Sequence, residues 1–164
     1  MGTARNLSKL LNPSGALADF QGQLIFPATQ NASANANTLD DYEEGTWTPG
    51  VASAGYTLAG SSGIYTKIGR QVTVIGYVAF SAVNASANSN ILFSGLPFTS
   101  ANLDGKIFYT GVSREDTTSG DIFVVQQQRG TASFGINSMD GVSSGSNQVF
   151  AINRDYSFSV TYFV

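Results

Sequence analysis

The densest group of chemically active side chains lies at residues 35–50, NANTLDDYEEGTWTPG. Four carboxylates fall within five positions and the only tryptophan follows them: Asp40, Asp41, Glu43, Glu44 and Trp47. Paired carboxylates hydrolyse glycosides, and clustered carboxylates bind calcium. Both chemistries need a rigid element that holds the carboxylates in opposed positions, and these four are neighbours in sequence. We therefore interpret the run as a solvated junction between two parts of the chain, with calcium binding and catalysis as alternatives.

A second acidic group lies at residues 114–121, REDTTSGD, which contain Glu115, Asp116 and Asp121. The spacing does not match an EF-hand loop, so a turn between two strands is favoured over a cation site.

The chain has no histidine and no cysteine. It therefore lacks the commonest general base and any thiolate metal ligand. Its serines have no histidine partner, and no G-x-S-x-G elbow lies between a strand and a helix. Trp47 or Tyr56 could stack on a sugar ring, but burial in a core or an interface is the favoured role of such aromatics. We predict no catalytic residue, no cofactor and no metal site.

Composition narrows the possible partners. Charged residues make up 12% of the chain and the formal net charge is −3. The basic residues are dispersed, whereas nucleic acid binding needs clustered Lys and Arg. No segment approaches the ~20 apolar residues of a membrane span, and we expect neither membrane insertion nor a signal peptide.

The N-terminal part is predicted to be an arm. Residues 4–11, ARNLSKLL, form the one convincing helical pattern, because three leucines at helical spacing share a face: Leu7, Leu10 and Leu11. A helix this short is marginal alone, so these leucines need another surface and are our candidate attachment residues. Residues 24–27, LIFP, are a second apolar patch, and residues 29–38 form a polar linker. We divide the chain into an arm over 1–34, a junction over 35–46 and one domain over 47–164.

From Trp47 onward the apolar residues alternate with a period of two. In residues 71–80, QVTVIGYVAF, both faces are apolar, which predicts a strand covered on both sides. Residues 155–164, DYSFSVTYFV, predict a strand with one buried and one wet face. Further candidate strands, separated by turn signals such as SSG, are Ile64–Ile68, Asn90–Phe93, Lys106–Val112, Asp121–Gln127 and Ala132–Ile136. We expect an all-β fold, a jelly-roll-like antiparallel sandwich of seven to eight strands.

Four ordered motifs carry a resemblance: FPATQ (26–30), NTLDDYEEGTWTP (37–49), YTKIG (65–69) and SGLPF (94–98). Together they resemble the C-terminal β-sandwich domain of bacteriophage tail fibre and other virion appendage proteins. ARNLSKL at the start is similar to the N-terminal segment of phage fibre proteins. The resemblance covers most of the chain, which lacks the extended shaft of long fibres. It implies a non-enzymatic protein that assembles in the bacterial cytoplasm and functions on the virion.

We therefore expect a short fibre of the tail or head, attached to other virion proteins through residues 1–34. Its knob would recognise a host cell-surface polysaccharide. A capsid decoration protein is the alternative, and a carbohydrate-active enzyme comes third. Recognition is expected in polar loops at one end of the sandwich, Asn84–Asn90, Arg114–Asp121 and Asn137–Asn147. The candidate ligand-binding residues are Asn84, Asn88, Asn90, Arg114, Asp116, Asn137 and Asn147.

The last expectation is a homotrimer. A strand apolar on both faces carries more hydrophobic surface than one core hides, and sheet edges with few charges invite pairing. Copies of the chain packed around a rotational symmetry axis would bury the apolar surface and the sheet edges. The resemblance to phage fibres implies that there are three copies. Candidate residues at the three-fold axis are Tyr77, Phe108 and Phe163.

Overall fold

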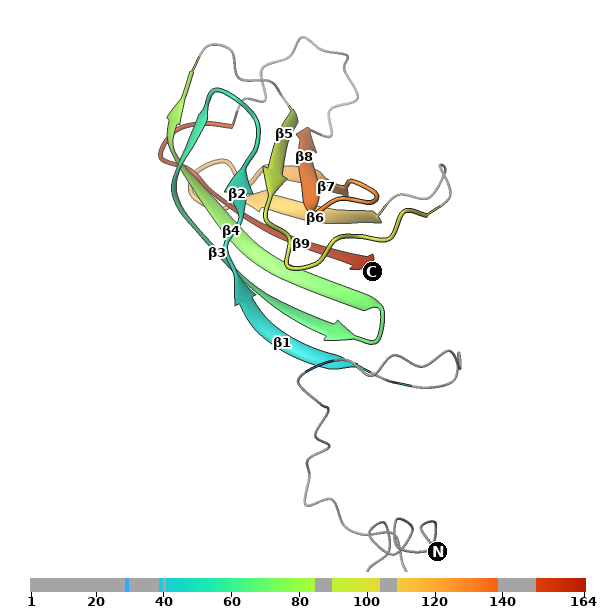
Figure 1. Ribbon diagram of the computed structural model, residues 1–164. Coiled ribbons are helices and arrows are strands. Elements are labelled where there is room, and N and C mark those ends of the chain that lie inside the picture. The colour runs from blue at the N-terminus through green and yellow to red at the C-terminus, as the bar shows by residue number, and fades with distance from the viewer. Residues whose placement is uncertain (1–28, 30–38, 40, 85–89, 104–108, 139–149) are drawn as a thin grey trace, which may run out of the picture.

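The computed structural model describes residues 29, 39, 41–84, 90–103, 109–138 and 150–164 (Figure 1). The regular elements within these residues are all β-strands, which confirms the all-β prediction. The strands are β1 (Tyr42–Trp47), β2 (Gly50–Val51), β3 (Tyr56–Ile68), β4 (Gln71–Val83), β5 (Asn90–Ser94), β6 (Tyr109–Glu115), β7 (Ile122–Gln127), β8 (Ser133–Ser138) and β9 (Asp155–Phe163). The predicted helix at 4–11, with Leu7, Leu10 and Leu11, lies outside the described residues.

The strands pair antiparallel in one sheet, in the order β1-β3-β4-β9-β6-β7-β8-β5-β2. The two edge strands, β1 and β2, are separated in sequence by only Thr48 and Pro49. The sheet therefore curls until its edges lie close together, as Figure 1 shows. The hydroxyl of Ser61, in β3, donates to the carbonyl of Pro49 at 2.7 Å and holds this link against the sheet.

This arrangement corrects two details of the prediction. We expected seven to eight strands in a two-sheet sandwich, and the described residues form nine strands in a single curled sheet. Alternation within a strand shows which side chains face inward but not which strands pair. The alternation therefore could not show that β1 and β2, which are joined by a short link, form the two edges of one sheet, or that this sheet curls.

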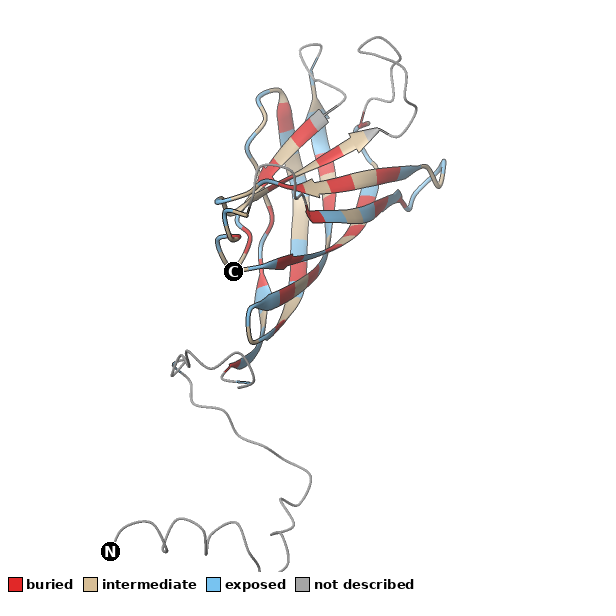
Figure 2. Ribbon diagram, turned by 90° about the vertical axis from the view of Figure 1, so that its right-hand side faces the viewer, coloured by how far each residue is buried: buried red, intermediate tan, exposed pale blue. Residues whose placement is uncertain are grey.

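The core occupies the inside of the curl, and Figure 2 shows buried residues alternating with intermediate and exposed ones along strands such as β4 and β9. Aromatic rings dominate it. Phe93 stacks on Phe134 with ring centroids 5.1 Å apart, and Phe134 contacts Phe158 at 4.8 Å. Phe80 contacts Tyr156 edge-to-face at 5.7 Å. Such pairs contribute ~0.5–1.5 kcal/mol each beyond the burial of their area.

Strand β9 confirms the predicted alternation. Tyr156, Phe158, Val160 and Tyr162 are buried, whereas the intervening residues are partly or fully exposed. Strand β4 agrees on one face only. Its inner residues Val72, Val74, Val78 and Phe80 are buried, but the outer Ile75 and Tyr77 are 51% and 43% exposed. The prediction that both faces of this strand are covered is not met within a single chain.

Strand β3 begins eight residues earlier than the predicted Ile64–Ile68, because residues 61–63, SSG, lie within it. Gly63 is there for packing. A Cβ at this position would lie 2.3 Å from Nε1 of Trp47 and 2.9 Å from the carbonyl oxygen of Ile75. Glycine in a strand often marks such a close approach, and we had interpreted this one as a turn signal.

Candidate functional site

The strand ends that flank the three predicted recognition loops lie at one end of the sheet. Asn90, which begins β5, pairs with Asn137 near the end of β8. Arg114, near the end of β6, pairs with Ile122 at the start of β7. Ala79, in the last third of β4, pairs with Asp155, where β9 begins.

The individual candidate residues differ in their surroundings. Asn84 is exposed and its backbone N–H donates to the carbonyl of Gly55 at 2.9 Å. Arg114 and Asp116 are exposed and form an ion pair with an N–O distance of 3.0 Å. Asn88 and Asn147 lie outside the described residues. The structure thus brings Asn90 beside Asn137 and Arg114 beside Asp116, at the same end of the sheet.

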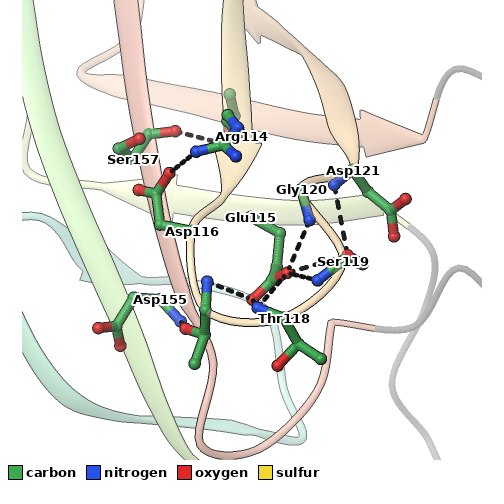
Figure 3. A network of polar contacts seen from close by, with 11 residues as sticks. Arg114, Glu115, Asp116, Thr118, Ser119, Gly120, Asp121, Asp155 and Ser157 are labelled. Carbon is green, nitrogen blue, oxygen red and sulfur yellow. Dashed lines mark hydrogen bonds and ion pairs between the residues drawn. The ribbon is translucent and has the colours of Figure 1, made fainter.

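Glu115, the last residue of β6, binds the loop that follows it and leads to β7, as Figure 3 shows. Its side chain is buried, and it accepts hydrogen bonds from backbone N–H groups of the loop that follows it. The donors are Thr117 at 2.8 Å, Thr118 at 3.0 Å, Gly120 at 3.2 Å, the N–H of Ser119, and the hydroxyl of Ser119 at 2.9 Å. Gly120 takes a φ of +69°, the left-handed region that glycine adopts without strain.

These bonds determine the charge state of Glu115. Burial alone raises the pKa of a carboxyl group, but the donors from Ser119, Thr118 and Thr117 outweigh it. The pKa of Glu115 falls from 4.5 to about 2. Glu115 is therefore an ionised structural anchor whose oxygens are used within its own loop. Of our two interpretations of residues 114–121, the turn agrees with this geometry. Within the described residues, no group of three or more Asp, Glu, His or Cys side chains is placed to hold a metal ion.

The acidic run at the start of the domain is divided between solvent and core. Glu43 and Glu44 are exposed on β1, as expected of a junction. Asp41 is buried and forms an ion pair with Lys67 of β3, which corrects the expectation that all of these carboxylates are solvated. Asp40 lies outside the described residues.

Phe98 covers this ion pair. The Nζ atom of Lys67 lies 5.5 Å from the centroid of the Phe98 ring, and Tyr65 meets the same ring edge-to-face at 5.3 Å. The hydroxyl of Tyr65 donates to Oε1 of Glu43. A cation over an aromatic face is attracted by the ring quadrupole, more strongly when water is excluded. We call this group of side chains the motif cluster: Asp41, Glu43, Tyr65, Lys67 and Phe98.

Trp47 anchors the other end of β1, as predicted. It is buried and meets Phe134 and Phe158 edge-to-face, with centroid distances of 6.1 and 6.0 Å. Its indole N–H has no hydrogen-bond partner among the described residues. This burial agrees with the preferred role in the core rather than with sugar stacking.

The motif cluster joins three stretches that are far apart in sequence. Asp41 and Glu43 belong to LDDYEEGTWTP, Tyr65 and Lys67 to YTKIG, and Phe98 to SGLPF. Sequence reasoning found these motifs but not that they meet. The period-two pattern that places Lys67 at an inward position of its strand was a signal that it needs a buried partner.

No helix in the part of the chain that the structure describes has the length and hydropathy to cross a membrane. Comparison of the chain with models of known protein families, with curated proteins and with solved structures finds no match.

Proposed function

We propose that this protein is a structural component of a bacteriophage virion, a short fibre of the tail or head that carries no enzymatic activity. Residues 1–34 attach it to other virion proteins, and the domain over 47–164 presents a surface for recognition of host polysaccharide. It assembles in the bacterial cytoplasm and functions on the particle.

The motif cluster is the observation that carries this proposal. The residues on which the resemblance to phage appendage proteins rests stabilise one another at the base of the sheet. Mutual support among separated motifs is expected of an inherited structural unit, because each local choice then agrees with the same fold. The acidic residue of this cluster that is buried serves in packing, which favours a structural role over a catalytic one.

The proposed homotrimer is supported by the outer face of the sheet. Ile64, Ile75 and Val112 are 57%, 51% and 53% exposed. Ile64 pairs directly with Ile75, which pairs with Ser159, which pairs with Val112. The row crosses β3, β4, β9 and β6 without a charged side chain. Exposed apolar patches of this kind mark interfaces. Because this row carries no charge, the outer faces of two copies of the chain can pack together without electrostatic repulsion.

Tyr77 and Phe163, two of the candidate axis residues, are also outward-facing and each 43% exposed. The third, Phe108, lies outside the described residues. A closed three-fold assembly that buries this outer face is the form of the protein that we propose for the virion.

The direct test is to locate the protein on the particle with a fused epitope and gold-labelled antibody. Label on the tail or on a head fibre supports the proposal, whereas label spread over the capsid shell identifies a decoration protein. Release of reducing sugar from host polysaccharide by the purified chain would instead identify an enzyme. Deleting residues 1–34 should leave a folded domain that is no longer incorporated into virions. Incorporation of the truncated chain would place the attachment site elsewhere.

A further inference from the structure

The contact between Lys67 and Asp41 holds an amine against a carboxyl group inside the folded domain. The Nζ atom of Lys67 contacts Oδ2 of Asp41, and the two side chains are only 6% and 8% exposed. Burying two ions is costly even when they are paired. An amine and a carboxyl group can also condense to an amide, which carries no charge. The two reactants of an amide bond are therefore in contact at a site that favours the uncharged product.

The backbone holds the two groups in position. Strands β1 and β3 pair in register from Tyr42, which lies opposite Ile68. One residue further, the N–H of Gly69 donates to the carbonyl of Asp41 at 2.8 Å, so the pairing continues past the end of β1. Asp41 and Lys67 are thus diagonal neighbours across one antiparallel pair. Groups held together in this way can reach effective concentrations of ~10⁵–10⁸ M, which favours a condensation that free groups in water do not undergo.

Aromatic side chains cover the contact. The ring of Phe98 lies 5.5 Å from Nζ of Lys67, and Tyr65 meets that ring edge-to-face at 5.3 Å. Exclusion of water has two effects. It disfavours the ionised forms of both groups, so that the amine gains a free lone pair and the carboxyl group a proton. It also keeps out the water that would hydrolyse an amide once formed.

Glu43 is placed to move the proton. It lies directly opposite Lys67 in the register of β1 and β3, a position that brings the Cβ atoms of two residues to about 4.5–5.5 Å. Its side chain is exposed and accepts a hydrogen bond from the hydroxyl of Tyr65. A carboxylate beside the amine and open to solvent can take a proton from nitrogen and give one to a departing oxygen.

We propose that Lys67 and Asp41 join in an intramolecular amide bond after the chain has folded. The lone pair of the neutral Nζ forms a C–N bond to Cγ of the protonated Asp41, and Glu43 takes a proton from the nitrogen. Glu43 then delivers this proton to the hydroxyl on Cγ, the C–O bond breaks, and one water leaves. No group is oxidised or reduced, and no co-reactant is consumed.

The freshly folded chain holds the ion pair, which the amide then replaces. The stability that the ion pair itself contributes is therefore measured on chain that still has the full mass of its sequence. The amide would tie the residue that precedes β1 covalently to β3. In a virion fibre attached through residues 1–34, a pull on the arm would then load a covalent bond at the entrance to the domain. Only this last consequence rests on the proposed function.

The test is the intact mass of the purified full chain, measured under denaturing conditions after incubation at neutral pH. We expect a mass lower than that of the sequence by one water, and a protease digest in which the peptide containing Asp41 is joined to the one containing Lys67. A natural chain that keeps the full mass of its sequence would overturn the inference.

Two variants identify the reacting atoms. Lys67→Arg keeps the positive charge but has no amine, so it should keep the full mass. Asp41→Asn offers the same carbon with a different leaving group, so it should lose one ammonia in place of one water. Loss of water in the Lys67→Arg variant would overturn the inference, because the loss would then arise elsewhere in the chain.

Glu43→Gln should slow the loss of water by about a hundredfold or more, and this chain should remain largely unreacted when the natural chain has reacted fully. Glu44→Gln is the matched control, because Glu44 is the next residue of β1 and points to the opposite face. Equal rates in the two variants would overturn the role of Glu43. The masses do not depend on where the protein sits on a virion, so failure of this inference and failure of the proposed function are distinguishable.

Discussion

Asp41 and Lys67 form a buried ion pair that ties the residue before β1 to the inner face of β3, under the ring of Phe98. Burying two charges costs several kcal/mol per ion, and the pair offsets this cost only while both partners are present.

The first prediction concerns this pair. Lys67→Met leaves the carboxylate of Asp41 buried without its cation and should lower the free energy of unfolding by about 3–5 kcal/mol. The double variant Asp41→Leu with Lys67→Met removes both charges and should recover most of that loss. Urea unfolding at neutral pH measures both values. A double variant no more stable than Lys67→Met would show that packing, rather than charge, accounts for the effect.

The second prediction uses the contact between Gly63 and Trp47. Gly63→Ala places a methyl group against the indole and against the Ile75 carbonyl, and should destabilise the fold by about 1–3 kcal/mol. Gly60→Ala is the matched control in the same strand, because a Cβ there meets only the hydroxyl of Tyr77 at 3.5 Å. The two melting temperatures should separate clearly. Equal losses would mean that the cost arises from the strand backbone and not from the tryptophan.

The third prediction is a dependence of stability on pH. The pKa of Glu115 is about 2 in the folded chain and 4.5 ordinarily, so the unfolded chain binds the proton more readily. The stability due to this carboxylate is therefore complete above pH 4.5 and lost progressively as the pH falls towards 2. Glu115→Gln should be much less stable than the natural chain at pH 7, and the difference should shrink through this window.

Asp116→Asn, at the exposed neighbouring carboxylate, is the control and should cost less stability at pH 7 than Glu115→Gln, because its ion pair with Arg114 is exposed to solvent. If Glu115→Gln lost the same stability at every pH, the hydrogen bonds of the loop would not depend on the charge.

The fourth prediction concerns assembly. Light scattering or native mass spectrometry should find a trimer of the purified chain, and Ile75→Glu should shift it to smaller species by placing a charge in the neutral row of the outer face. Ile152→Glu is the control, because Ile152 is as exposed as Ile75 but lies outside the strands. A natural chain that stays monomeric at micromolar concentration would refute both the trimer and the role of the outer face.

The fifth prediction concerns the loops at Asn84–Asn90, Arg114–Asp121 and Asn137–Asn147. Phage carrying all three replaced by unrelated polar sequences should adsorb poorly to the host. In the second loop, Glu115 and Ser119 should be kept so that the fold survives. Normal adsorption after all three replacements would exclude these loops from recognition.

Much of the fold follows from local patterns. The alternation in residues 155–164 correctly assigned the inward residues of β9, because a strand places successive side chains on opposite faces whatever its partners are. In residues 71–80 it did not separate the buried face of β4 from the exposed one, because both faces are apolar. The burial of Trp47 was predicted for a similar reason, since a large aromatic beside a strand gains most by leaving water. These assignments need only the residues next to one another in the chain.

The errors arose where distant residues decide the outcome. Gly63 was predicted to lie in a turn, but it lies in a strand and packs against the indole of Trp47. Asp41 was predicted to be solvated, but it is buried in an ion pair with Lys67. The turn after Glu115 was predicted, but its binding of the buried Glu115 carboxylate through backbone N–H groups was not.

The sequence by itself thus determined the all-β class, the inward residues of β9 and the motifs that carry the resemblance. Only the tertiary structure decided that the described residues form nine strands in one curled sheet and that the motifs meet around one ion pair. The physical reason is that side-chain alternation is a property of one strand. Register, curl and buried partners depend instead on contacts between residues far apart in sequence.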